Sequence, residues 1–433
     1  MTVRIADQAL NEAIARAHAA SDIAHGDVSQ WAGIEKYAAT RGADPTPERA
    51  AVIADLLGLP VGTSNEAAYE AAARSMLATF GPTPLREHLV AWLREDITVA
   101  EPLLAVFTGH GTDVEHPVIE VQETESAKLA TWLTAQEGAP VEILRAEIIG
   151  GGFSRRMWRT TVSVNGLLRN IIVRSEQGGM FGTNTMTEVA SMRGLLAAGY
   201  RVPTILHVEP TGTVLGEPFF IMEEVRGRVR LDDAGLDDII RSVAELHGVP
   251  VTAINTSNRG AEQVIRDNID GWLSLYRAHA TTPIPLIEQG AAWLRENLEP
   301  TGPSVIVHGD AGPGNALFDE EHGLTVLDWE FAHVGDAAED WAYLALIRGR
   351  RTMSADAWKV RLNETIGLAI TDLQWRNWLA YNHYRGACVN LTALTVFGEG
   401  THRTADQLAI GIAVHLRFLG QLIDITCSPD GSR

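Results

Sequence analysis

The chain has 433 residues, of which 45% are hydrophobic and 21% charged, a balance typical of a soluble globular protein with two or three folding units. Its formal net charge of −20 repels nucleic acid and anionic lipid, so no nucleic-acid partner is expected. We also expect a cytoplasmic protein without membrane contact, because no run of roughly 20 apolar residues or secretory leader stands out and the two cysteines form no disulfide or metal-binding pattern.

The first hundred residues predict helices only. Apolar residues recur at helical spacing in segments rich in alanine, leucine and glutamate, namely 4–21, 47–59, 65–80 and 84–96. We therefore predict an all-helical N-terminal domain at 1–105, which shows no catalytic set of residues. It could shape a binding pocket or mediate a homodimer. Glycine, aspartate and proline then occur without periodicity, which predicts a linker at 106–123.

A small lobe with β-structure is predicted at 124–226. Residues 141–176 alternate in polarity and are rich in β-branched side chains, and Asn165-Gly166 is the preferred pair for a two-residue hairpin turn. A glycine-rich bend precedes this hairpin at Gly150–Gly152. A helix at 185–199 and two strands at 202–210 and 217–227 complete the lobe.

Helices dominate the rest of the chain, which we predict to be a larger helical lobe at 227–433. Two strand-like segments, 304–310 and 323–331, interrupt it. The fold class is thus α+β, with an antiparallel lobe beside a helical lobe, preceded by the helical N-terminal domain. The cleft between two such lobes is where small ligands usually bind.

One group of polar residues in the helical lobe is a candidate catalytic site. "HGDAGPGN" contains Asp310 and Asn315, and "LDWE" contains Asp328. Asp310 could accept a proton from a hydroxyl group, and Asn315 and Asp328 offer the oxygen ligands that Mg²⁺ prefers. Taken singly, Asp310 and Asn315 are typical turn residues. Asp328 lies in an apolar strand, where an aspartate is costly to bury without a partner or a metal. A hairpin would bring Asn315 and Asp328 side by side.

These two motifs resemble those of the aminoglycoside phosphotransferase-like kinases, small-molecule relatives of the protein kinases, over residues 125–425. The resemblance implies a bilobal protein-kinase-like fold that uses ATP (or GTP) and Mg²⁺. It makes Asp310 the catalytic base and Asn315 and Asp328 the metal ligands. It also gives His308 and Asp340 structural roles.

The resemblance implies further nucleotide-binding residues: Gly151, Gly152 and Ser154 in the phosphate-covering loop, Arg174 on the third strand, Glu188 on the helix, and Glu223 and Val225 at the hinge. Most of the family has a lysine where this chain has Arg174. A subgroup that includes kinase-like domains attached to some acyl-CoA dehydrogenases resembles it in having arginine there. Arginine keeps the charge but differs in shape and can grip a carboxylate with two nitrogens.

The acceptor is expected to be a small hydroxylated organic molecule. Aromatic residues of the helical lobe form either a pocket for it or ordinary core, namely Trp272, Tyr276, Trp378, Tyr381 and Tyr384. His383 and Arg385 beside them would suit a hydroxylated or carboxylate-bearing acceptor. The alternatives are a hydroxyacyl-CoA kinase, an aminoglycoside-type antibiotic kinase, and a nucleotide-binding scaffold without turnover.

Overall fold

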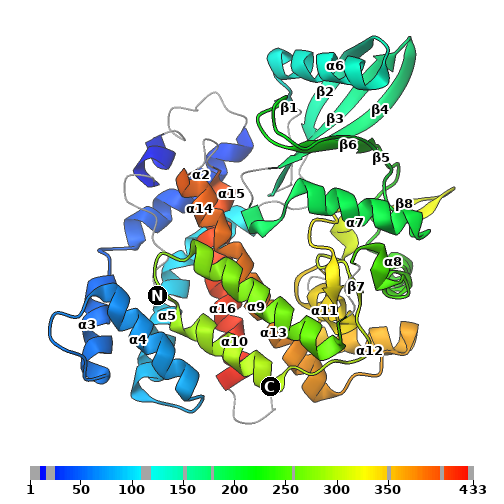
Figure 1. The fold of residues 1–433 in the computed structure, drawn as a ribbon. Coiled ribbons are helices and arrows are strands. Elements are labelled where there is room, and N and C mark those ends of the chain that lie inside the picture. Colours follow the sequence, from blue (N-terminus) through cyan, green and yellow to red (C-terminus); the bar gives the residue numbers. More distant parts are fainter. Residues whose placement is uncertain are drawn as a thin grey trace.

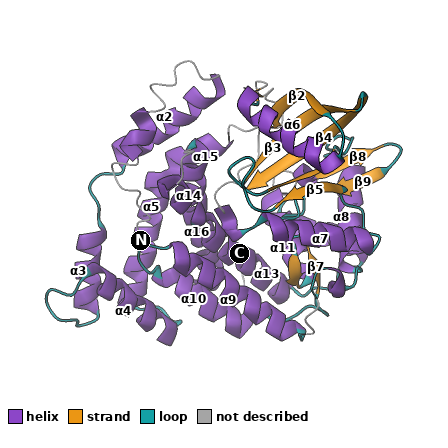
Figure 2. Cartoon of the chain, turned by 45° about the horizontal axis from the view of Figure 1, so that its top comes forward, coloured by secondary structure: helices purple, strands orange, loops and turns teal. Residues whose placement is uncertain are grey.

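The computed structural model describes most of the chain, as residues 10–15, 25–108, 119–149, 154–176, 180–255, 259–348, 353–399 and 404–427. An antiparallel β-sheet lobe is followed along the chain by a helical lobe (Figure 1). Figure 2 shows the strands of the large sheet gathered at one end of the molecule, with helices making up most of the remainder. The predicted bilobal α+β architecture is therefore confirmed.

The first lobe is built on a six-stranded sheet in the order β1-β2-β3-β4-β6-β5, in which every neighbouring pair is antiparallel. Asn165 and Gly166 form the β3–β4 turn with φ angles of 51° and 81°, as the sequence predicts. The lobe consists of β1 (Ile119–Glu120), α6 (Glu123–Glu137), β2 (Val141–Ile149), β3 (Arg155–Val164), β4 (Leu167–Glu176), α7 (Thr185–Ala197), β5 (Ile205–Glu209) and β6 (Phe219–Glu223).

The alternation of side chains along each strand decides which residues of the sheet face the second lobe. Phe219 packs in the cluster beneath α6, whereas Phe220 packs in the cluster with α7, which lies on the opposite face (Figure 1). That second cluster also contains Ile306 and Trp329 from the helical lobe. Because Arg174 is two residues from Ile172, a member of the same cluster, its side chain also points towards the helical lobe.

The helical lobe carries two small antiparallel sheets, β7–β10 and β8–β9, among its helices. Its strands are β7 (Val305–Val307), β8 (Ala316–Asp319), β9 (Gly323–Val326) and β10 (His333–Gly335). Its helices include α8 (Asp233–His247), α9 (Ala261–His279), α10 (Pro285–Asn297), α11 (Ala337–Tyr343), α12 (Ala355–Ile366), α13 (Asp372–Asn390), α14 (Thr392–Glu399), α15 (Ala405–Leu408) and α16 (His415–Cys427).

The N-terminal helices share one hydrophobic core with the helical lobe. They are α2 (His25–Thr40), α3 (Thr46–Leu56), α4 (Asn65–Ala78) and α5 (Pro84–Thr108). Helix α4 packs on α10, and α5 packs on α16 (Figure 1). The approach of α5 to α16 is close, since a Cβ added to Gly420 would lie 2.8 Å from Ile97 Cδ1. These helices therefore extend the core of the lobe.

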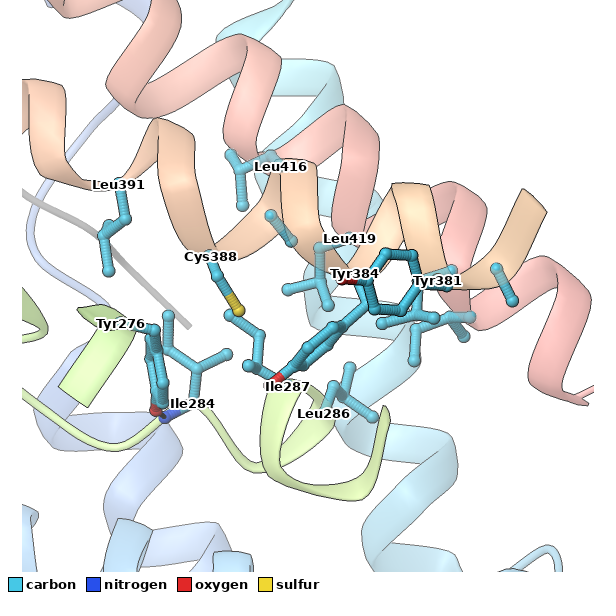
Figure 3. Packing of buried hydrophobic residues seen from close by; sticks show 14 of the residues in the cluster. Tyr276, Ile284, Leu286, Ile287, Tyr381, Tyr384, Cys388, Leu391, Leu416 and Leu419 are labelled. Carbon is cyan, nitrogen blue, oxygen red and sulfur yellow. Dashed lines mark hydrogen bonds between the residues drawn. The ribbon is translucent and has the colours of Figure 1, made fainter. Parts of the chain in front are cut away.

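Most of the aromatic residues considered for an acceptor pocket are core residues. Tyr276, Trp378, Tyr381 and Tyr384 are each at most 1% exposed, and only Trp272 of this set is half-buried. Their polar atoms are largely satisfied within the core: the Tyr276 hydroxyl accepts from the Ile284 N–H at 2.6 Å, and the Tyr384 hydroxyl donates to the Ile269 carbonyl at 3.0 Å. Figure 3 shows the tyrosines packed with aliphatic side chains around Cys388. The pocket interpretation is wrong for these four residues.

One helical run corrects the expectation that no segment is long and apolar enough to span a membrane. Residues Ala405–Thr426 meet that criterion among the described parts of the chain, and 67% of the run is buried inside the fold. The run packs against α5, α10 and α13. A core helix meets the same criterion, and the packing of this run accounts for its apolar character.

Stability is expected to fall in mild acid because two histidines are buried uncharged. Burial lowers the pKa of His383 and of His415 to about 4. In the unfolded chain both titrate near pH 6.5, so the unfolded state binds more protons between about pH 6.5 and 4, and the folding free energy is lost as the pH falls through this window. The shift of the pKa from about 6.5 to about 4 corresponds to a loss of roughly 3 kcal/mol of unfolding free energy for each histidine. Urea unfolding at pH 7.5, 6.5 and 5.0 measures this loss.

Two variants test whether His383 contributes to this loss of stability in acid. Between about pH 6.5 and 4, unfolding free energy should vary less steeply with pH in His383→Gln than in the wild type. The difference in slope should correspond to about one bound proton. Asn363→Gln, at an exposed position of α12 that does not titrate, should leave the dependence unchanged. Equal pH dependence of His383→Gln and the wild type would refute the assignment to His383.

Candidate active site

The loop after β7 is fixed by a buried carboxylate. Asp340 of α11 accepts from the backbone N–H of His308 at 2.9 Å and of Gly309 at 2.8 Å, and from His247 Nε2 at 3.0 Å. Burial raises the pKa of Asp340, but the hydrogen bond and charge of His247 and the contacts of His308 outweigh it, so the pKa lies below its ordinary value. Asp340 thus has the structural role that the resemblance implied.

His308 ties this loop to the segment that carries Asp328. Its Nε2–H donates to the carbonyl of Leu327 at 2.9 Å, which leaves Nδ1 to accept from the N–H of Asp310 at 3.1 Å. The ring also lies 4.6 Å, centroid to centroid, from that of Trp329. These contacts fix the tautomer of His308 and the distance between the two motifs.

Asp310 and Asn315 are in direct contact. The Asn315 side-chain amide donates to the Asp310 backbone carbonyl at 2.9 Å and to its Oδ2 at 2.7 Å. Both residues are buried. The short helical turn Pro313–Asn315 folds the chain back so that a residue five positions later reaches the aspartate. Because its nitrogen is directed at Asp310, the Oδ1 atom of Asn315 is directed away from it.

Asp328 lies beside this pair, immediately after β9. The N–H of Leu327 donates to the Asn315 carbonyl at 2.8 Å, and Ala316 is paired with Val326. The β8–β9 hairpin thus brings Asn315 and Asp328 together, as the sequence predicts. Asp328 lies outside the strand with a φ of 67°, which is strained for a residue that is not glycine, and its side chain is 28% exposed.

Arg174 joins the two lobes. Its Nε lies 2.9 Å from Glu188 Oε1 of α7, and its NH2 group donates to Asp328 Oδ1. Burial lowers the pKa of Arg174, but the charges of Asp328 and Glu188 outweigh it and raise the pKa above its ordinary value. The structure therefore brings together the predicted cation, the helix acid and one predicted metal ligand.

Two buried residues that the sequence did not single out belong to the same cluster. Arg155 Nε lies 3.4 Å from Glu188 Oε2, and Arg155 NH2 lies 3.4 Å from Glu330 Oε2. Glu330 also accepts from Ser154 Oγ at 2.5 Å and from Thr183 Oγ1 at 2.9 Å. Burial, followed by the charge of Asp328, raises the pKa of Glu330 to about 7.

The alternation of side chains along the predicted strand could have placed Arg155 beside Arg174 from the sequence. In the predicted hairpin it lies two residues before Met157, which pairs with Arg174 across β3 and β4. Arg155 and Arg174 therefore share a face of the sheet. Glu330 is the last residue of the "LDWE" motif, and the sequence alone does not indicate that it is buried.

The remaining predicted residues are placed only in part. Ser154 contacts Glu330, whereas Gly151 and Gly152 lie outside the described residues. Glu223 is the last residue of β6, and its exposed carboxylate accepts from the N–H and hydroxyl of Thr204 at 3.0 Å. Val225 follows it, half-buried. The adenine-binding role of the Glu223 carbonyl and the Val225 N–H stays a prediction.

Removing the charge of Glu188 is expected to destabilise the fold more than removing that of Glu330. Each oxygen of Glu188 faces an arginine, so in Glu188→Gln one guanidinium would meet an amide N–H group. Breaking such a buried pair costs about 3 kcal/mol of unfolding free energy. Glu330 mainly accepts from two hydroxyl groups, which can also pair with an amide, so Glu330→Gln should cost less than about 1 kcal/mol. Chemical denaturation of both variants at neutral pH measures the difference, and equal losses would contradict it.

Comparisons with known proteins agree with the motifs. The mouse (Mus musculus) acyl-CoA dehydrogenase family member 10 is 26% identical over 276 residues, which is 55% of this chain and 26% of that protein. The chicken (Gallus gallus) acyl-CoA dehydrogenase family member 11 is 31% identical over 166 residues, or 35% of this chain and 21% of that protein. The chain thus spans about a quarter of the length of the curated relatives it matches.

Among solved structures, a thermostable mutant of aminoglycoside phosphotransferase APH(4)-Ia in complex with AMP-PNP and hygromycin B aligns with a TM-score of 0.48 and 15% identity. The alignment covers 69% of this chain and 98% of that one. The model of the phosphotransferase enzyme family matches residues 145–373, just over half of the chain and the segment that contains β3, Glu188, Asp310, Asn315 and Asp328. The family expected from the motifs is confirmed: this chain belongs to the phosphotransferase enzyme family.

Proposed function

We propose that this protein transfers the γ-phosphoryl group of ATP, or of GTP, to a hydroxyl group of a small organic molecule, with Asp310 as the base. The observation that supports this most directly is the contact of Asp310 with Asn315 at 2.7 Å, beside Asp328 on the same hairpin. Arg174 and Glu188 lie next to this group on the side of the sheet lobe. Phosphoryl transfer requires positioning and charge neutralisation more than covalent help, and these residues suit both tasks.

In the proposed reaction, the acceptor hydroxyl oxygen forms a bond to the γ-phosphorus while the bond from that phosphorus to the β–γ bridging oxygen breaks. The hydroxyl proton moves to the Asp310 carboxylate, and the nucleoside diphosphate leaves. Asn315 holds Asp310 Oδ2, which fixes the direction in which the carboxylate meets the acceptor.

The residues present fit a magnesium ion. Asn315 Oδ1 accepts no hydrogen bond from the described residues, and the half-buried carboxylate of Asp328 adds a second hard oxygen ligand. Asn315 and Asp328 would hold the ion through these oxygens. When bound, Mg²⁺ would neutralise charge on the nucleotide phosphates. Arg174, in contact with Asp328, adds a fixed positive charge at the same place.

A hydroxyacyl-CoA is the second candidate for the acceptor. The relatives from mouse and chicken described above are both named as acyl-CoA dehydrogenase family members. An enzyme of this kind would phosphorylate a hydroxyl on the acyl chain. We place it after the general proposal, because the names describe proteins about four times longer than the matching region.

Asp310→Asn should strongly reduce turnover without weakening nucleotide binding. The substitution keeps the size of the side chain and its contact with Asn315 but removes the proton acceptor, so kcat should fall by about 100-fold or more. Nucleoside diphosphate release is measured with a panel of hydroxylated acceptors that includes a hydroxyacyl-CoA and an aminoglycoside, and nucleotide affinity by calorimetry. Unchanged turnover in Asp310→Asn would refute the base assignment. Nucleotide binding without turnover on any acceptor would favour the scaffold alternative.

Asp328→Asn tests the metal site separately. The loss of one carboxylate should weaken magnesium-dependent nucleotide binding by about tenfold, while binding measured with the metal chelated should change little. A matched variant, Asp319→Asn at the other end of the same hairpin, should leave both affinities unaltered. Equal nucleotide affinity of Asp328→Asn and the wild type in magnesium would contradict the assignment.

A further inference from the structure

Arg385 of α13 lies beneath the catalytic loop and is not available to an acceptor. Its side chain is only 4% exposed, and NH1 donates to the Gly309 carbonyl at 2.6 Å. The same nitrogen lies 3.5 Å from Glu339 Oε1. His383, the other polar residue considered for acceptor binding, is also buried. A role for Arg385 must therefore act through the residues that surround it.

Three aromatic rings enclose the guanidinium. Its central carbon lies 4.8 Å from the ring centroid of Phe331, 5.2 Å from Tyr343 and 5.3 Å from Trp272. These distances are within the range of cation–π attraction. Phe331 follows the "LDWE" motif, so the cage joins the helical core to the segment that carries Asp328. Rotation of the guanidinium is restricted on all these sides.

A histidine shares the buried carboxylate. His333 Nε2 lies 3.1 Å from Glu339 Oε2, and His333 Nδ1 lies 2.7 Å from the Phe331 carbonyl. Burial lowers the pKa of His333, but the charge of Glu339 and these hydrogen bonds outweigh it and raise the pKa. Glu339 thus contacts both Arg385 and His333. A buried group of this kind is costly to desolvate, so each of its members depends on its partners.

The contact of Arg385 with Gly309 determines the orientation of one peptide unit. The Gly309 carbonyl and the Asp310 N–H belong to the same planar peptide group. Arg385 holds its oxygen at 2.6 Å, and His308 Nδ1 holds its N–H at 3.1 Å. With both ends fixed, the plane cannot rotate, and the direction of the Cα–Cβ bond of Asp310 is limited accordingly.

The loop also has no room for movement on the side of Gly309. Its φ is 79°, and an added Cβ would lie 2.8 Å from Phe331 Cβ and 2.9 Å from the Phe331 carbonyl oxygen. Arg385 NH2 would lie 3.2 Å from the same added atom. Gly309 is therefore enclosed by Arg385 and by Phe331, one of the three rings around the guanidinium.

We infer that Arg385 is a positioning residue for Asp310: it fixes the Gly309–Asp310 peptide and thereby the direction of the catalytic carboxylate. Its catalytic consequence rests on the proposed function, whereas its effect on the loop does not. Misplacement of a reacting group by about 1 Å can cost on the order of 100-fold in rate. A loss in kcat without a loss of substrate affinity is the signature of this role.

The test compares Arg385→Met, Arg385→Lys and the control Arg376→Met. Arg376 is on the same helix and also donates to a backbone carbonyl, that of Ile425, away from the loop. Arg385→Met should lower kcat by about 100-fold, with nucleotide Kd and acceptor KM within about threefold of the wild type. Arg385→Lys can still donate to Gly309 and should recover part of the loss. Arg376→Met should keep the wild-type kcat.

Hydrogen–deuterium exchange of a peptide covering 306–316 supplies a readout that needs no turnover. In Arg385→Met this peptide should exchange about tenfold faster, with peptides of α10 and α16 unchanged. A raised acceptor KM at constant kcat would assign Arg385 to acceptor binding and overturn the inference, as would unchanged exchange at 306–316. Faster exchange throughout the helical lobe would indicate a merely structural residue. A wild type that turns over no acceptor would overturn the proposed function, while the exchange result would still decide whether Arg385 positions the loop.

Discussion

The ion pairs of Arg174 connect the sheet lobe to the helical lobe, and both lobes contribute residues to the candidate active site. One guanidinium contacts a carboxylate of the sheet lobe, Glu188, and a carboxylate of the helical lobe, Asp328. Burial of Arg174 and Glu188 would be strongly unfavourable if either were unpaired. The pairing therefore favours the arrangement of the lobes in which α7, β4 and the end of β9 meet, and the loop that carries Asp310 lies beside that junction.

The loop that carries Asp310 illustrates a second constraint. An irregular loop cannot satisfy its buried N–H and C=O groups through regular strand or helix pairing, so other elements must do so. Asp340 of α11 accepts from two consecutive N–H groups, and Arg385 of α13 donates to the carbonyl of the second residue. His308 adds a link to Leu327. The rigidity of the loop thus comes from three buried polar side chains: Asp340 on α11, Arg385 on α13 and His308 of the loop itself.

The sequence predicted the parts whose signal is local. The Asn165-Gly166 turn follows from backbone preferences, and the buried position of Glu188 follows from helical spacing. Residues that depend on packing between distant elements were not predictable in this way. Arg385 was considered for an acceptor site, because nothing in the sequence indicates that Gly309 would lie against it. Likewise, helix periodicity predicts α4 and α5 but not that they share a core with α10 and α16.

The arginine at position 174 is explained by the charges around it. Its two carboxylate contacts use different nitrogens, Nε for Glu188 and NH2 for Asp328, which the single nitrogen of a lysine would have to serve alone. Arg155 occupies the other oxygen of Glu188, so two cations face three acids: Glu188, Asp328 and Glu330. The third acid, Glu330, has its pKa raised to about 7 and accepts from two hydroxyl groups. A lysine at 174 would carry the same charge but would offer one nitrogen to both Glu188 and Asp328, at the place where the nucleotide phosphates are proposed to bind.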